Sequence, residues 1–130
     1  VVELAARGAG SKVFTEILPS VTGISTTRAS IEAALGQKPE LTLQHTGMAA
    51  SLIFLDPVPG VFQSAGGVEA ALALPYVSEV IIYPQVGQRL RELRSGPDRA
   101  GHLLVYAPDA DTCRSTAQTA LSLIQLQVTP

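Results

Sequence analysis

The residues best suited to chemistry stand at the start of the chain. Glu3 closes a short apolar segment, and Arg7 follows four positions later at the beginning of a glycine-rich turn, RGAGS. A carboxylate suits Mg²⁺, which prefers oxygen ligands and is often shared with substrate phosphates, and a guanidinium can hold phosphoryl oxygens. The amides of residues 8–11 and of a following helix could support the same anion. The spacing alone leaves open a weak surface ion pair between the same two side chains.

Other polar residues are predicted to be structural. His45 lies in a polar connection and is expected to be solvated, and His102 lies within a strand pattern, where a structural or surface role is favoured. Cys113 falls on the apolar stripe of a helix, which predicts a buried, inert thiol. Asp98 and Arg99 are interpreted as residues that fix a loop. The sequence contains no His/Cys cluster with zinc spacing and no recognisable Ser-His-Asp arrangement.

The first third of the chain has to position the glutamate, the arginine and the turn. Residues 1–6 predict a strand and residues 12–18 a helix that ends at Pro19. Ser25 or Thr26 is expected to cap a second helix through Leu35, followed by Gly36. Residues 37–47 are polar and predict a connection, with a short strand near residues 41–43.

The rest of the chain follows a different pattern, dominated by short apolar runs. Strands are predicted at residues 48–55, 61–64, 77–83 and 101–107, with a return segment at 88–93. Helices are predicted at residues 68–74 and 111–127, the latter capped by Asp109 or Asp111. The fold class is therefore α+β: an antiparallel sheet of at least four strands with helices packed on one face.

Composition excludes several classes of protein. The chain has 130 residues, 46% of them hydrophobic, which suits a packed core. Its formal net charge of −2 gives no basic excess for nucleic acid or a membrane surface. The apolar runs are too short to span a bilayer. One cysteine cannot form an internal disulfide, which fits a reducing compartment, and we expect a cytoplasmic protein.

The beginning of the sequence predicts a piece of a longer polypeptide. The chain opens on Val1 within an apolar segment, without an initiator Met or a polar lead-in. We expect residues 1–47 to be the end of one domain and residues 48–130 to be a C-terminal α+β domain.

Several motifs, in order and spacing, resemble the ATP-grasp ligases over nearly the whole chain. ELAARGAG from Glu3 resembles the end of the ATP-grasp catalytic core, where Glu, any residue, Asn, any residue and Arg precede glycines. VTGIS from Val21 resembles the next landmark, a Thr-Gly pair and an apolar residue usually followed by Asp. The second half resembles the C-terminal domain of the L-amino-acid-ligase branch, which is similar to biotin carboxylase. The matching stretches are residues 52–60, 66–69, 75–80 and 95–102.

The resemblance implies an ATP-dependent carboxylate–amine or carboxylate–thiol ligase that works through an acyl phosphate. Glu3 would then ligate Mg²⁺ between ATP phosphates, and Arg7 would act catalytically by stabilising the transferred phosphoryl group. Gly8, Gly10 and Ser11 would line the phosphate side of the substrate pocket. The implied partners are small carboxylate and amine substrates and upstream ATP-grasp domains, with residues 1–47 a strand–helix remnant of the core.

Two positions depart from the family pattern. Ala5 replaces the usual Asn and cannot ligate a metal, and Ser25 replaces the usual Asp. The nucleotide-binding lysines, the phosphate-covering loop and the second metal-binding acid of the family would all precede Val1. We therefore expect the chain to be inactive alone.

One alternative function stays open, a non-catalytic α+β module that packs on a partner domain or binds an effector. Such a module has no need of Glu3, Arg7 and the glycine turn, which favour the ligase. The two substrates and the oligomeric state are also open, with a homodimer as one option.

Overall fold

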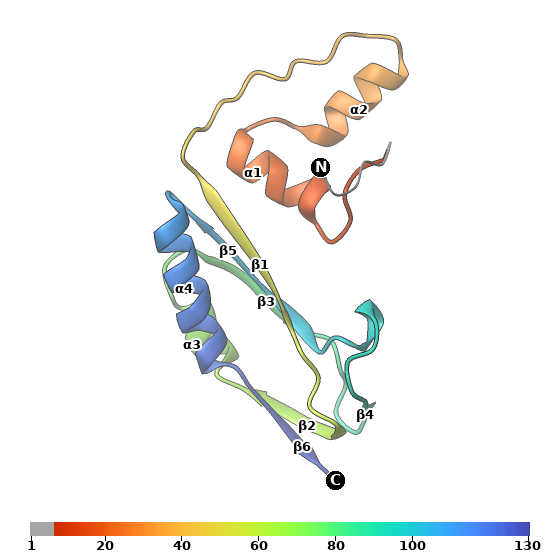
Figure 1. The fold of residues 1–130 in the computed structure, drawn as a ribbon, viewed down its shortest axis with the longest axis vertical. Coiled ribbons are helices and arrows are strands. Elements are labelled where there is room, and N and C mark those ends of the chain that lie inside the picture. Colours follow the sequence, from red (N-terminus) through yellow and green to blue (C-terminus); the bar gives the residue numbers. More distant parts are fainter. Residues whose placement is uncertain (1–6) are drawn as a thin grey trace. The chain divides into compact units, whose positions relative to one another are not determined.

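The computed structural model describes residues 7–130, which form two compact units that divide after Met48 (Figure 1). The first unit is helical, with the π-helix η1 at Val13–Ile17, α1 at Leu18–Thr22 and α2 at Thr26–Ala34. The second unit carries the strands, two further α-helices and the 3-10 helix η2 at Gly96–Asp98. The predicted α+β class with antiparallel sheets is confirmed, whereas the predicted strand at residues 1–6 lies outside the described residues.

Helix α2 begins and ends close to where its sequence predicts. The Ser25 side chain accepts a hydrogen bond from the Arg28 backbone nitrogen at 3.4 Å, as an N-cap residue does. Gly36, just beyond the helix, has a φ of +73°, the left-handed conformation that glycine adopts without strain. Both signals were local, so sequence alone located this helix.

Two predictions for the first unit were wrong. Pro19 does not end the first helical segment, because it lies in the first turn of α1, where its missing N–H is not needed. Residues 37–47 form the predicted connection, but the short strand expected near residues 41–43 is not formed. The backbone nitrogen of Gln44 instead donates to the carbonyl oxygen of Thr22 at 2.8 Å, which ties this connection back to the end of α1.

The larger sheet of the second unit has the order β1-β5-β3, with β5 in the centre. Its strands are β1 at Ala49–Leu55, β5 at Gly101–Ala107 and β3 at Val77–Ile82, all antiparallel. Gly101 pairs with Leu55 on one side and Ile82 on the other. A Cβ at Gly101 would lie 2.2 Å from the Ile81 carbonyl oxygen, so the central strand needs glycine where it enters the sheet.

The strands do not form the single sheet of four or more that was predicted. A second sheet has the order β4-β2-β6, from β4 at Arg89–Leu90, β2 at Gly60–Gly66 and β6 at Gln125–Thr129. Helix α4, at Ala110–Leu123, ends four residues earlier than predicted. The final segment, Gln-Leu-Gln-Val-Thr, alternates exposed and half-buried residues, the period-two pattern of a strand.

Helices α3, at Val68–Leu72, and α4 lie together on one face of the larger sheet (Figure 1). Their small residues meet the apolar side chains of β5 in a buried core formed by Ala71, Leu103, Val105, Ala107, Cys113, Ala117 and Ala120. Alanines on the helices allow close approach to the sheet, while leucine and valine on the strand fill the volume. This core makes β5 a rigid support for the side chains on its other face.

Candidate functional site

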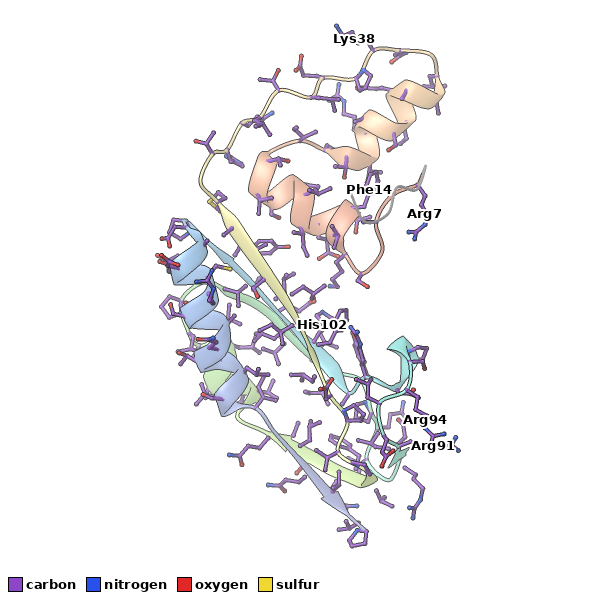
Figure 2. The ribbon with its side chains drawn as sticks, viewed as in Figure 1. Arg7, Phe14, Lys38, Arg91, Arg94 and His102 are labelled. Atoms are coloured by element: carbon purple, nitrogen blue, oxygen red, sulfur yellow. The ribbon has the colours of Figure 1, made fainter. Side chains whose placement is uncertain are left out.

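The glycine turn places Arg7 in solvent at the start of the first unit (Figure 2). The Arg7 Nη1 atom donates to the Gly8 carbonyl oxygen at 3.2 Å, and its charge has no acidic partner within residues 7–130. Gly8 is required sterically, because a Cβ there would lie 2.9 Å from the Phe14 ring. Gly10 has open space around it. The turn thus presents a guanidinium and small residues in an accessible loop.

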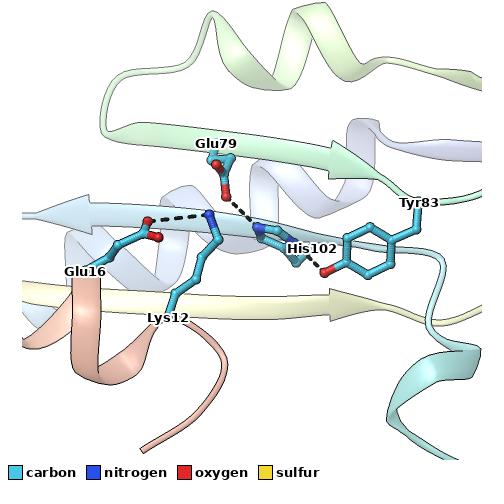
Figure 3. Close-up of polar contacts among 5 residues, drawn as sticks. All are labelled: Lys12, Glu16, Glu79, Tyr83 and His102. Atoms are coloured by element: carbon cyan, nitrogen blue, oxygen red, sulfur yellow. Dashed lines mark hydrogen bonds and ion pairs between the residues drawn. The ribbon is translucent and has the colours of Figure 1, made fainter.

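The backbone at the end of this turn is strained. Ser11 and Lys12 have φ values of 53° and 64°, and a positive φ is uncommon for residues other than glycine. The Val13 backbone nitrogen donates to the Gly10 carbonyl oxygen at 3.1 Å, and Lys12 pairs with Glu16 at 3.4 Å (Figure 3). Such strain is often kept where a backbone must hold a ligand, which suits the predicted role of Gly8, Gly10 and Ser11.

The metal prediction rests on Glu3, which lies outside the described residues. Within residues 7–130 no group of three or more His, Cys, Asp or Glu side chains could hold a metal ion. The roles given to Glu3 and Arg7 stay predictions.

The Thr-Gly landmark borders a cavity of about 250 Å³ in the first unit. Gly23 has a φ of +74°, and a Cβ there would lie 2.5 Å from the Gln44 side chain, so both conformation and space require glycine. Arg28 pairs with Glu32 at 2.7 Å, and the hydrogen bond to Glu32 raises the Arg28 pKa. The one arginine of this cavity is thus already paired with Glu32, while Glu40, which also lines it, accepts hydrogen bonds from Thr42.

A polar chain in the second unit joins Glu79, His102 and Tyr83 (Figure 3). The His102 Nε2 atom lies 2.5 Å from Glu79 Oε1, and its Nδ1 atom lies 2.6 Å from the Tyr83 hydroxyl. The His102 side chain is buried, whereas Glu79 and Tyr83 reach solvent. The structural role predicted for His102 is confirmed, and the chain links β3 to the central strand.

Sequence reasoning missed Glu79 and Tyr83. In the sheet, Ile81 lies directly opposite His102. Glu79 and Tyr83 lie two positions before and after Ile81, so their side chains are on the same face as that of His102 and diagonally across from it. Their period-two spacing was visible in the sequence, but the pairing with His102 depends on the register of two strands that are distant along the chain.

The predictions for His45, Cys113 and Asp98 are confirmed. His45 is exposed. Cys113 is buried in the core, and burial together with the charge of Asp109 raises the pKa of its thiol. Asp98 fixes its loop, because its Oδ2 atom accepts from the backbone nitrogen and hydroxyl of Ser95, both at 2.8 Å. These hydrogen bonds hold the pKa of Asp98 below its usual range.

Residues 52–129 match the sequence model of a family described as L-amino acid ligase C-terminal domain 2. The match covers more than half of the chain. The chain belongs to this family.

Solved structures support the same fold for this L-amino acid ligase C-terminal domain. An L-amino acid ligase from Bacillus licheniformis aligns at 19% identity with a TM-score of 0.75. The alignment covers 96% of this chain and 31% of the ligase chain. A phosphoribosylglycinamide synthetase from Anaerococcus prevotii aligns at 15% identity with a TM-score of 0.67, and the alignment covers 92% of this chain and 31% of the synthetase chain. An N5-carboxyaminoimidazole ribonucleotide synthetase from Thermotoga maritima aligns at 19% identity with a TM-score of 0.57, and the alignment covers 88% of this chain and 30% of the synthetase chain. No curated protein matches in sequence.

The family match and the folds confirm the resemblance to the C-terminal portion of ATP-grasp ligases. The chain spans about a third of the length of the solved relatives it matches. The family match begins at Leu52, so the glycine turn with Arg7 precedes the matched residues. Among the described helices of this ligase domain, none is long and apolar enough to cross a membrane.

Proposed function

We propose that this chain is the C-terminal part of an ATP-dependent ligase that joins a small carboxylate substrate to an amine or a thiol. The observation that carries the proposal is the family match over residues 52–129, preceded by an exposed glycine turn that begins with Arg7. The proposed ligase includes upstream ATP-grasp domains in the same polypeptide. The chain alone is proposed to be inactive, and the whole enzyme to be cytoplasmic.

In the proposed reaction, a substrate carboxylate oxygen attacks the γ-phosphorus of ATP, and ADP leaves. The resulting acyl phosphate is attacked by the amine or thiol, and phosphate departs. Such phosphoryl transfer depends mainly on positioning and on stabilising negative charge. The chain's contribution would be to supply cationic and amide donors beside the phosphates.

The residues of the turn fit this task. Arg7 is exposed and without an acidic partner among residues 7–130, so its guanidinium can face an anionic oxygen. Gly8 leaves the backbone accessible on a turn already held by Gly10 and Val13, and Ser11 adds a hydroxyl. Glu3 would hold Mg²⁺, which would neutralise phosphate charge, and the replacement of the family's usual Asn by Ala5 leaves fewer ligands from this segment.

Substitutions at the two charged residues test the proposal in the longer polypeptide. Glu3→Gln should weaken Mg²⁺ binding, and Arg7→Lys should remove the planar fork that matches phosphate oxygens. Each should lower turnover by about 100- to 1000-fold, the usual cost of one transition-state contact. Melting temperatures should stay close to that of the parent protein.

The controls are conservative changes of the same type at exposed positions. Arg94→Lys and Glu69→Gln repeat the two substitutions on the second unit and should leave turnover unchanged. Near-native turnover in both site variants, or loss of activity that follows unfolding, would show that Glu3 and Arg7 are structural. The non-catalytic alternative would then be favoured.

A further inference from the structure

An arginine-lined cavity lies in the second unit, in the segment that connects β3 to β5. Its volume is about 290 Å³, and the residues that matter for its chemistry are Tyr83, Arg89, Leu90, Arg91, Asp98 and Arg99. All of them fall between positions 83 and 99, so one continuous segment forms the cavity. It shares no residue with the glycine turn of the first unit.

Positive charge predominates in this cavity, although the whole chain has a net charge of −2. Three arginines line it against a single aspartate. The side chains of Arg89 and Arg91 make no hydrogen bond or ion pair with any described residue. Figure 2 shows Arg91 and Arg94 extending from the segment that follows β4. The charge of Arg91 also acts on the Asp98 carboxylate, but both guanidinium groups are exposed and can face an external anion.

The carboxylate of Asp98 accepts hydrogen bonds from residues of its own loop. Oδ2 of Asp98 accepts hydrogen bonds from the Ser95 backbone nitrogen and hydroxyl, both at 2.8 Å, and from the Arg94 backbone nitrogen at 3.1 Å. This carboxylate shapes the wall of the cavity and neutralises only part of the arginine charge.

The third arginine is held in place and has an unsatisfied donor. The Arg99 guanidinium carbon lies 3.8 Å from the centre of the Phe54 ring, a cation–π contact that fixes the plane of the group. Its Nε atom is buried and has no hydrogen-bond partner among the described residues. A buried donor without a partner is unfavourable, and this one is enclosed too closely for an external oxygen to reach it, so the contribution of Arg99 to the cavity is its charge.

From these observations we propose that the cavity binds the phosphate group of a small molecule. A phosphate dianion matches the excess of arginine over aspartate better than a monocarboxylate does, and its oxygens can accept from several guanidinium groups at once. The proposal does not depend on the ligase function, because it uses neither Glu3 nor Arg7.

Calorimetric titration of the full chain with inorganic phosphate tests this proposal. Saturable one-site binding is expected, and Arg89→Gln combined with Arg91→Gln should weaken it by about tenfold or more. The matched control combines Arg94→Gln with Arg114→Gln, which removes the same charge at positions that do not line the cavity. The control should bind phosphate like the parent. Phosphate should also shift the backbone amide signals of residues 83–99 in NMR spectra.

Three results would overturn the proposal. The first is the absence of saturable phosphate binding to the parent chain. The second is equal weakening in the two double variants, which would indicate general surface charge. The third is acetate binding as tightly as phosphate, which would remove the case for a phosphate group. Circular dichroism on each variant confirms that folding is retained, which is expected because Arg89 and Arg91 are exposed.

Discussion

Replacement of His102 by leucine should destabilise the second unit measurably. The substitution puts an apolar side chain at a buried position and removes the hydrogen bonds to Glu79 and Tyr83. The side chain of Glu79 is 28% exposed and Tyr83 is 46% exposed, so both groups can recover water when their partner is lost. The expected loss is therefore about 1–3 kcal/mol, below the cost of two fully buried unpaired groups.

This loss should appear in both chemical and thermal unfolding. For a unit of this size, each 1 kcal/mol lowers the melting temperature by about 4–8 °C. Tyr83→Phe removes one neutral hydroxyl and should cost about 0.5–1.5 kcal/mol. Tyr76→Phe is the matched control, because the Tyr76 hydroxyl makes no hydrogen bond with any described residue, and it should change stability by less than about 0.5 kcal/mol.

A double-mutant cycle separates the polar chain from simple packing. In the His102→Leu background, Tyr83→Phe should have almost no further effect, because the hydrogen-bond partner of the hydroxyl is already gone. Equal costs for Tyr83→Phe in the two backgrounds would refute the coupling. So would a His102→Leu variant as stable as the parent.

Two further predictions concern the same unit. Gly67→Ala should destabilise it by about 2 kcal/mol or more, because Gly67 has a φ of +76° and a Cβ would lie 1.8 Å from the Leu123 carbonyl oxygen; urea denaturation measures this, and an unchanged midpoint would contradict it. The stability of this unit should also fall in acid, because hydrogen bonds lower the folded-state pKa of Asp98 and Asp109 below the unfolded values. The stabilisation that these two carboxylates give the folded state is present above the unfolded pKa and is lost as the pH falls through the folded pKa. Melting temperatures of Asp98→Asn and Asp109→Asn should vary less with pH between neutral and acid than that of the parent, and an unchanged pH profile in both would count against this assignment.

Local signals made much of the fold predictable. Asp109 caps α4, and its carboxylate accepts from the Thr112 backbone nitrogen at 2.8 Å, as a helix-start residue should. Cys113 lies on the buried face that its helical spacing indicated. The order of strands and helices from β1 to α4 was predicted, because each element depends on residues that are near one another in sequence.

Features that depend on distant pairing were missed. The division into two sheets depends on β2 pairing with β6, some sixty residues away, where Ser64 lies opposite Gln127. The helix prediction ran past Leu123 because neither glycine nor proline marks the end of α4. The partners of His102 were missed for the same reason, since register sets which side chains meet across a sheet.

The candidate site was predicted as residue types, and its geometry was not. The sequence indicated that Arg7 begins a glycine turn, but not that Gly8 admits the Phe14 ring or that Ser11 and Lys12 take positive φ values. The arginine cavity was not anticipated, because Arg89 and Arg91 were interpreted only as part of a return segment. A cavity depends on how a segment folds over itself, and residue spacing does not give that information.

The central claim is tested most directly by following carboxylate oxygen through the reaction of the longer polypeptide. The enzyme is supplied with ATP, Mg²⁺, an amine or thiol and a carboxylate substrate whose carboxylate carries heavy oxygen, and the released phosphate is analysed by mass spectrometry. An acyl phosphate transfers one substrate oxygen to phosphate, so the account predicts labelled phosphate and unlabelled ADP, with none formed by residues 1–130 alone. Label in AMP, or ATP turnover that releases only unlabelled phosphate, would contradict the proposed ligase mechanism.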